Sequence, residues 1–189
     1  MQELILQLDY WLLEQINQRW TSPVTDFIFY WLSDLNKIPY FKLIAPLIVL
    51  GPFVYRYKKQ GFIQFILLVM ALGLSDWTGG QIKHVFERPR PIDNLAIQVV
   101  SRTEAGGGSF YSNHSSNMMT FAIYTAEFFP AAKIPLIVLA GLVAYSRVYN
   151  GVHYPSDVLF GMLMGLVWGL LFIKLARRIG KVSALQTTE

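Results

Sequence analysis

The sequence predicts an all-α protein: a multi-pass membrane bundle of about five spanning helices, preceded by amphipathic N-terminal helices. Of its 189 residues, 53% are hydrophobic and 15% are charged, whereas soluble domains average about 25% charged residues. Several apolar runs also approach the roughly 20 residues that a helix needs to cross a bilayer. The length fits one domain, so we expect a single domain over residues 1–189, with amphipathic helices in 1–37 and the transmembrane bundle in 38–178.

The N-terminal segments have helical patterns with one apolar face. Residues 2–19 carry apolar side chains at helical spacing, with polar side chains on the other faces, and residues 21–37 repeat that pattern. Ser22 is the expected N-cap of the second helix, with Pro23 at its first position. We expect both helices to lie at the membrane interface. The residues expected at headgroup level are Trp11, Trp20 and Trp31. The alternative is that residues 21–37 cross the membrane, but their apolar centre is short.

Five apolar runs have about the length of a membrane span. We expect these spans at 38–55, 62–84, 113–129, 133–150 and from Pro155 to about Leu175. The last run carries Gly161, Gly165 and Gly169, which form a row of small residues at every fourth position. Because such rows let two helices approach closely, we interpret this row as a packing seam.

Short clusters of basic residues beside these runs predict the orientation of the chain. The clusters on one side comprise Arg56, Lys58, Lys59, Lys133, Lys174, Arg177, Arg178 and Lys181. The positive-inside rule assigns that side to the cytoplasm. The opposite side carries Lys83, Arg90 and Arg147, which runs against the rule, so we interpret these three cations as ligand-binding. Topology accounts for much of the net charge of +4, and nucleic acid is therefore not expected as a partner.

Three polar clusters fall on that opposite side: residues 83–91, 112–114 and 146–157. Together they offer cations, hydroxyl groups, two histidines and a carboxylate. This set suits a phosphate ester, because arginine forks match phosphate oxygens and a helix N-terminus, expected at Asn113, presents free N–H groups to an anion. No acidic cluster is present to hold Mg²⁺. We therefore expect no metal and no cofactor, and we expect the cations to stabilise the charge of the transition state.

The spacing within these clusters resembles that of a known family. Lys83 to Pro91 reads K-x6-R-P, Ser112 to His114 reads S-x-H, and Ser146 to Asp157 reads S-R-x5-H-x3-D. This triple motif resembles the type 2 phosphatidic acid phosphatase family. Members are integral-membrane lipid phosphatases that share a phosphate site with bacterial acid phosphatases and vanadium haloperoxidases.

The resemblance implies a multi-pass enzyme of the bacterial inner membrane, with its active site on the outer side. Such an enzyme removes phosphate from a phospholipid or an isoprenoid phosphate and needs no nucleic acid. Substrates in the family include undecaprenyl pyrophosphate, phosphatidylglycerol phosphate, phosphatidic acid and the lipid A phosphates. The sequence leaves open which of these lipids is used, and it does not predict an oligomeric state.

Carried over to this sequence, the resemblance assigns roles to eight residues. It implies that His153 attacks phosphorus and becomes a phosphohistidine, while Asp157 holds the other ring nitrogen. It implies that His114 protonates the leaving oxygen and then activates water. The residues implied in phosphate binding are Lys83, Arg90, Ser112, Asn113 (through its backbone) and Arg147.

The second motif departs from the family's usual P-S-G-H. Here it reads Tyr111-Ser112-Asn113-His114. Because asparagine tolerates a positive φ better than most residues, we expect Asn113 to preserve the turn that glycine makes. We expect Tyr111 in place of proline to loosen this turn and to put an aromatic ring near the mouth of the site.

Other polar residues have less specific interpretations. Asp76 is expected to make a hydrogen bond within the bundle, and His84 is expected to be structural. Arg88 is either an interfacial anchor or a part of the site. Arg102 and the glycines 106–108 predict a mobile loop, with a lid over the substrate as the sharper alternative.

Two other functions are compatible with parts of this pattern. One is a lipid-binding or transport protein that retains the fold without catalysis. Pure binding would need neither histidine nor Asp157, so the full motif favours an enzyme. A vanadium haloperoxidase would share the phosphate site, but the predicted membrane spans argue against it.

Overall fold

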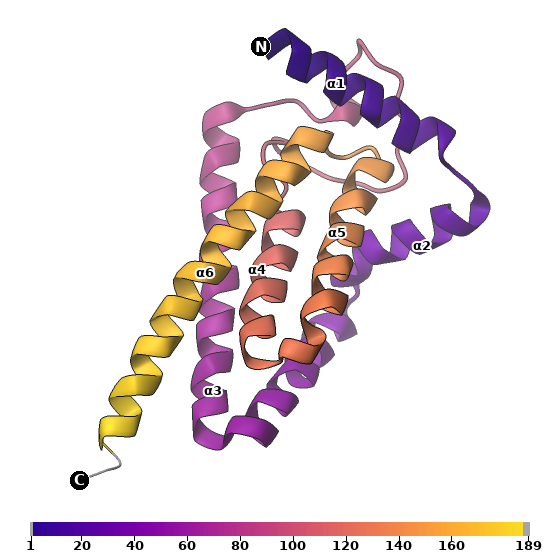
Figure 1. Ribbon diagram of the computed structural model, residues 1–189. Helices are drawn as coiled ribbons and strands as arrows, with labels where there is room; N and C mark the ends of the chain where they lie inside the picture. Colours follow the sequence, from indigo (N-terminus) through magenta and orange to yellow (C-terminus); the bar gives the residue numbers. More distant parts are fainter. Residues whose placement is uncertain (1, 187–189) are drawn as a thin grey trace.

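A computed structural model describes the backbone of residues 2–186 and the side chains of residues 3–35 and 37–180. All regular structure in this part of the chain is helical, which confirms the all-α prediction (Figure 1). The helices are α1 (Gln2–Glu14), α2 (Pro23–Asp34), α3 (Pro39–Phe86), α4 (Asn113–Phe128), α5 (Lys133–Tyr149) and α6 (Pro155–Gln186). A π-helical turn, Gln15–Arg19, continues α1.

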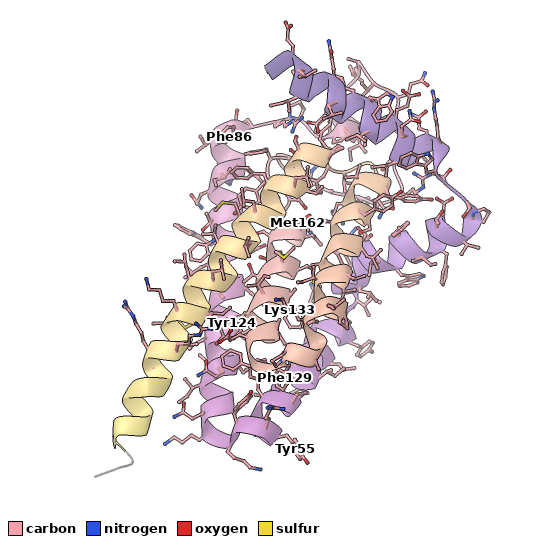
Figure 2. All side chains as sticks on the ribbon, in the orientation of Figure 1. Tyr55, Phe86, Tyr124, Phe129, Lys133 and Met162 are labelled. Carbon is pink, nitrogen blue, oxygen red and sulfur yellow. The ribbon has the colours of Figure 1, made fainter. Side chains whose placement is uncertain are left out.

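Helix α3 consists of two limbs that fold back on each other at Lys58. This residue leaves the helical region, with φ 53° and ψ −130°. The reversal is tight, since a Cβ at Gly61 would lie 1.9 Å from the carbonyl oxygen of Phe53. The two limbs correspond to the predicted spans 38–55 and 62–84. Figure 2 labels Tyr55 beside the reversal and Phe86 at the far end of the second limb.

Helix α4 lies in the middle of the bundle, between α5, α6 and the second limb of α3 (Figure 1). Its contact with α6 is close because α6 presents glycines to it. A Cβ at Gly161 would lie 2.5 Å from the oxygen of Ser112, and one at Gly165 would lie 2.2 Å from the oxygen of Ser116. Gly169 packs against Ile123 in the same way. The predicted packing seam on α6 is therefore confirmed.

Three helical segments of the described chain are long and apolar enough to cross a membrane. They are Pro39–Asp93, Pro130–Tyr149 and Pro155–Gly180. The first contains both limbs of α3. Helix α4 has 16 residues, which is short for a span, but it runs beside these segments inside the bundle (Figure 1). The two limbs of α3, α4, α5 and α6 thus occupy the positions of the predicted spans.

The second N-terminal helix is too short to cross a bilayer. Helix α2 has 12 residues, or about 18 Å of helix, whereas a hydrocarbon core is about 30 Å thick. The alternative that residues 21–37 form a span is not supported. The predicted N-cap of α2 is present, since the N–H of Thr25 donates to Ser22 Oγ at 3.2 Å and Pro23 follows at the first position.

Helix α1 lies across one end of the bundle (Figure 1). Its inner face contributes Leu13 to a core cluster with Tyr149 and Val158, which fixes α1 to the ends of α5 and α6. The opposite face leaves apolar side chains exposed, namely Leu4, Ile5, Leu8 and Trp11. An exposed apolar face on a short amphipathic helix is typical of a helix in a membrane interface.

Candidate active site

A cavity of about 450 Å³ opens at the end of the bundle where α4 begins. Its polar lining comes from α3, α4, α5 and the connections between helices: Lys37, Asp76, Lys83, Arg90, Glu104, Asn113, His114, Asn117, Arg147 and His153. Six of the eight residues implied by the sequence resemblance are in this lining. The other two, Asp157 and Ser112, lie behind it.

Local chain geometry brings the three polar clusters together. Helix α3 ends after Lys83 because Glu87 adopts a left-handed conformation, with φ 43°, and Pro89 cannot continue a helix. Helix α5 ends just after Arg147, where Gly151 turns the chain with φ 77°. The chain then passes directly from α5 through His153 into α6.

The ring of His153 has a polar neighbour at each nitrogen. Its Nε2 lies 3.2 Å from Arg90 Nη1, and its Nδ1 faces Asp157 Oδ2 at 3.5 Å. A guanidinium group can only donate hydrogen bonds, so Nε2 must be the acceptor and the ring proton must be on Nδ1. Burial lowers the pKa of His153 to about 3, with Asp157 opposing this shift and Arg90 and Arg147 adding to it. The ring is therefore neutral near pH 7, and the lone pair on Nε2 accepts the hydrogen bond from Arg90.

Asp157 is fully buried behind His153. Its Oδ1 accepts a hydrogen bond from Arg88 Nη1 at 2.6 Å, and its Oδ2 accepts one from the N–H of Tyr154 at 2.9 Å. These partners fix the carboxylate so that Oδ2 also faces the imidazole. The arrangement is the one that orients a histidine nucleophile.

Three of the four cations that line the cavity, Arg90, Arg147 and Lys83, differ in how many of their donors are occupied. Arg90 donates to the carbonyl oxygens of Gly106 and Val152, both at 2.8 Å. Arg147 donates to Ser33 and lies 3.7 Å from Asp34 Oδ1. Its Nε has no hydrogen-bond partner in the described part of the chain.

The ammonium group of Lys83 makes no hydrogen bond or ion pair with any described residue, although the side chain lines the cavity. Free donors on buried or partly buried cations are available to an anion. The cavity therefore has the chemistry to bind phosphate oxygens.

Asn113 does not make the turn that we expected. Among the described residues, Lys58 and Glu87 are the only non-glycine residues with a positive φ. Asn113 is the first residue of α4 and has helical backbone geometry. The expectation of a positive-φ turn is therefore wrong. Asn113 Nδ2 instead donates to the carbonyl and carboxylate oxygens of Asp76, at 3.1 and 3.0 Å. It clamps α4 to α3, and the predicted bundle hydrogen bond of Asp76 is confirmed.

Tyr111 is also placed differently from the expectation. Its ring is fully buried and lies 5.7 Å from the ring of Phe160, so it packs between helices and does not reach the mouth of the site. Burial of a large aromatic surface on α6 accounts for this position. Ser112 is buried beside it. Its Oγ caps α4 by accepting from the N–H of Ser115 at 3.4 Å, and its side chain does not line the cavity.

The sequence analysis did not identify the roles of three carboxylates in the N-terminal helices. Asp34 lies beside Arg147, Asp26 pairs with Arg102 at 2.7 Å, and Asp9 pairs with Arg88 at 2.8 Å. The sequence did contain a signal for the burial of Asp9. This residue shares its helical face with Leu13 and Ile16, at spacings of four and seven residues. An aspartate on the buried stripe of a helix indicates a partner elsewhere in the chain.

Arg88 pairs with Asp9 and Asp157 and is therefore not a free interfacial anchor. Arg102 stacks on Tyr149 at 4.6 Å, and the mobility of its loop stays a prediction. His84 is exposed and outside the cavity lining.

The fold and the cavity together define an integral-membrane helical bundle with a cationic site that contains two histidines. The chain belongs to the PAP2 superfamily, whose family model matches residues 64–181. This range contains all three polar clusters, and the resemblance noted in the sequence is confirmed.

Individual relatives agree with this assignment. A putative undecaprenyl-diphosphatase of Escherichia coli is 34% identical over 104 residues, which cover 54% of this chain and 52% of that protein. The chain spans about half the length of the first curated relatives that it matches. The crystal structure of LpxE from Aquifex aeolicus has a TM-score of 0.71 at 26% identity, covering 86% of this chain and 93% of that one. A transmembrane phosphatidylglycerolphosphate phosphatase of PAP2 type from Bacillus subtilis shares the fold, with a TM-score of 0.75 at 22% identity over 93% of this chain and 88% of the other.

Proposed function

We propose that the protein is a metal-independent lipid phosphatase that acts through a phosphohistidine at His153. One observation carries the proposal: the unprotonated Nε2 of His153 faces a cavity that also holds Lys83, Arg90 and Arg147. A nucleophile and three phosphate-binding cations thus share one space. These cations supply the positive charge that the transition state of phosphoryl transfer needs.

In the first step, the lone pair of His153 Nε2 attacks phosphorus and the bond from phosphorus to the leaving oxygen breaks. His114, which lies in the same cavity, enters this step protonated, donates its proton to that oxygen and becomes neutral. The imidazole becomes positively charged as it is phosphorylated. The carboxylate of Asp157 stabilises this charge through the proton that remains on Nδ1.

In the second step, water attacks the phosphohistidine. Neutral His114 accepts a proton from the water as its oxygen bonds to phosphorus, and the bond from phosphorus to Nε2 breaks. The products are inorganic phosphate and a neutral His153. The same cations hold the phosphoryl oxygens in both steps, because the charge remains on those oxygens throughout.

The substrate class follows from the membrane location of the site. We propose phosphate esters or diphosphates of membrane lipids, namely undecaprenyl pyrophosphate, phosphatidylglycerol phosphate, phosphatidic acid or a lipid A phosphate. Support comes from the family and from the E. coli relative, whose name specifies an undecaprenyl-diphosphatase. The cavity lies at the end of the bundle that helix α1 crosses (Figure 1), where a lipid headgroup is within reach.

We further propose that this end of the bundle faces outward from the cytoplasmic membrane of a bacterium. The basic residues Arg56 and Lys58 lie at the reversal of α3, and Lys133 begins α5 at that same end of the bundle, opposite to the cavity (Figures 1 and 2). The positive-inside rule favours the cytoplasm for that end. The site then reaches lipids of the outer leaflet.

Phosphate release from a panel of those four lipids tests the proposal. The purified protein, in detergent and with EDTA present, is expected to release phosphate from at least one lipid, and His153→Ala is expected to release none. Activity that disappears in EDTA and returns with Mg²⁺ would overturn the metal-independent mechanism. Equal release by His153→Ala would overturn the assignment of the nucleophile.

A further inference from the structure

We propose that Asp9 and Arg88 are positioning residues for the catalytic carboxylate. In this inference Arg88 holds Asp157 so that Oδ2 faces His153. Asp9 of helix α1 prevents Arg88 from also donating a hydrogen bond to Asp157 Oδ2. The inference rests on the proposed phosphohistidine mechanism. It adds Asp9, which lies outside the three motifs, and Arg88, which occupies an unspecified position within the first motif. Asp9 also brings in helix α1, which lies outside residues 64–181, the part matched by the family model.

The guanidinium of Arg88 bridges two buried carboxylates. Its Nη1 donates to Asp157 Oδ1 at 2.6 Å, and its Nη2 donates to Asp9 Oδ2 at 2.8 Å. The side chains of Asp9 and Asp157 are 3% and 0% exposed. The plane of the guanidinium lies over the ring of Tyr154, 4.0 Å from its centroid. Each arm of the fork is therefore committed to a different carboxylate.

Asp9 is itself held at the start of α6. The N–H of Ser156 donates to Asp9 Oδ1 at 2.8 Å, and the hydroxyl of Ser156 donates to Asp9 Oδ2. Two carboxylates, Asp9 and Asp157, thus lie at one helix N-terminus, which favours negative charge. Buried charges of like sign need a cation between them, and Arg88 is that cation.

The order of the three groups, with the Arg88 guanidinium between the carboxylates of Asp9 and Asp157, has a consequence for catalysis. An arginine fork binds a single carboxylate best through both oxygens. Without Asp9, Nη2 of Arg88 would be free to bind Asp157 Oδ2, which is the oxygen that faces His153 Nδ1 at 3.5 Å. The imidazole would then lose the partner that fixes its tautomer. Asp9 prevents this competition by occupying Nη2.

The experiment compares Asp9→Asn with a matched control on the same helix. Glu14→Gln makes the same change from carboxylate to amide, but the Glu14 side chain is 45% exposed and pairs only with Arg19 in the described structure. Asp9→Asn is expected to lower kcat for short-chain phosphatidic acid about tenfold, with KM changed less than about twofold. Glu14→Gln is expected to leave both constants unchanged. Wild-type kcat in Asp9→Asn, or an equal loss in Glu14→Gln, would overturn the inference.

A second measurement separates positioning from mere anchoring of α1. In ¹⁵N-histidine-labelled protein, the Nδ1 signal of His153 reports its tautomer. The inference expects a protonated Nδ1 in the wild type and in Glu14→Gln, and a mixture of tautomers in Asp9→Asn. An unchanged Nδ1 signal in Asp9→Asn would contradict it. This signal needs no turnover, so it decides the inference even if no lipid is hydrolysed, an outcome that would overturn only the proposed function.

Arg88→Lys carries the test if Asp9→Asn fails to fold. The ammonium group keeps the positive charge between the two carboxylates but has no planar fork. We expect about a tenfold loss of kcat here as well. Where Asp9→Asn does fold, adding it to Arg88→Lys should cost little more, because Asp9 acts through the fork. Wild-type kcat in Arg88→Lys, or fully multiplicative losses in the double variant, would contradict the inference.

Discussion

Arg90 Nη1 lies 3.2 Å from His153 Nε2, so a permanent cation donates a hydrogen bond to the nitrogen that we propose as the nucleophile. This contact has two effects. It keeps Nε2 unprotonated, and it places the phosphate-binding cation next to the point of attack. A phosphate that enters the cavity can take over the donor of Arg90 and leave the lone pair of Nε2 directed at phosphorus.

The first prediction concerns the protonation of His153. Burial lowers its pKa to about 3, from an ordinary value near 6.5, so the folded protein keeps this ring neutral where an unfolded chain would protonate it. In ¹⁵N-histidine spectra, the His153 signals should not change between about pH 8 and about pH 5. A titration of His153 near its ordinary pKa would contradict the burial argument.

The same shift predicts how stability depends on pH. The unfolded state binds more protons than the folded state between the two pKa values, so His153 contributes stability that is complete above about pH 6.5 and is lost as the pH falls toward about 3. Thermal unfolding of the wild type and of His153→Gln over this range measures the contribution. The difference between the two curves should change with pH in the stated direction.

The second prediction concerns Arg90→Lys. The fork of Arg90 donates to Gly106, Gly107, Val152 and His153, and a single ammonium group cannot replace it. We expect kcat/KM for a lipid phosphate to fall about 100-fold although the charge is kept. Arg56→Lys, at the opposite end of the bundle, is the control and should retain wild-type activity. A loss of less than about threefold in Arg90→Lys would indicate that charge alone is sufficient.

The sequence predicted the features that depend on local pattern. Apolar periodicity located the helices, and the fixed spacings around Lys83, His114 and His153 located the cavity lining. It did not predict the pairs Asp9–Arg88 and Asp34–Arg147, because their members lie 79 and 113 residues apart, respectively, and meet only when the N-terminal helices cover the bundle. The conformation of Asn113 was mispredicted for a related reason. Its partner, Asp76, is on another helix.

The third prediction concerns the contact between α3 and α4. A Cβ at Gly79 would lie 2.2 Å from Asn113 Oδ1, whereas one at Gly80 would meet nothing within 4 Å. Gly79→Ala should therefore displace the Asn113 clamp and lower Tm by about 5 °C, since overpacking costs about 1–3 kcal/mol. Gly80→Ala is the matched control in the next position, and alanine should slightly raise its Tm. Equal Tm values for the two variants would show that the clamp does not contribute to stability.

The last prediction distinguishes the two histidines by the leaving group. We propose that His114 protonates the leaving oxygen, and an alkoxide leaving from phosphatidic acid needs this proton far more than a lipid phosphate leaving from a lipid diphosphate. His114→Ala should therefore lower kcat for phosphatidic acid at least about tenfold more than kcat for a lipid diphosphate. His153→Ala, which removes the nucleophile, should abolish both reactions equally. Acid-quench experiments with a radioactive diphosphate substrate add a direct measure, because His114→Ala should still form a base-stable, acid-labile phosphoprotein and His153→Ala should not. Label on His114, or equal losses for the two lipids in His114→Ala, would contradict the assigned roles.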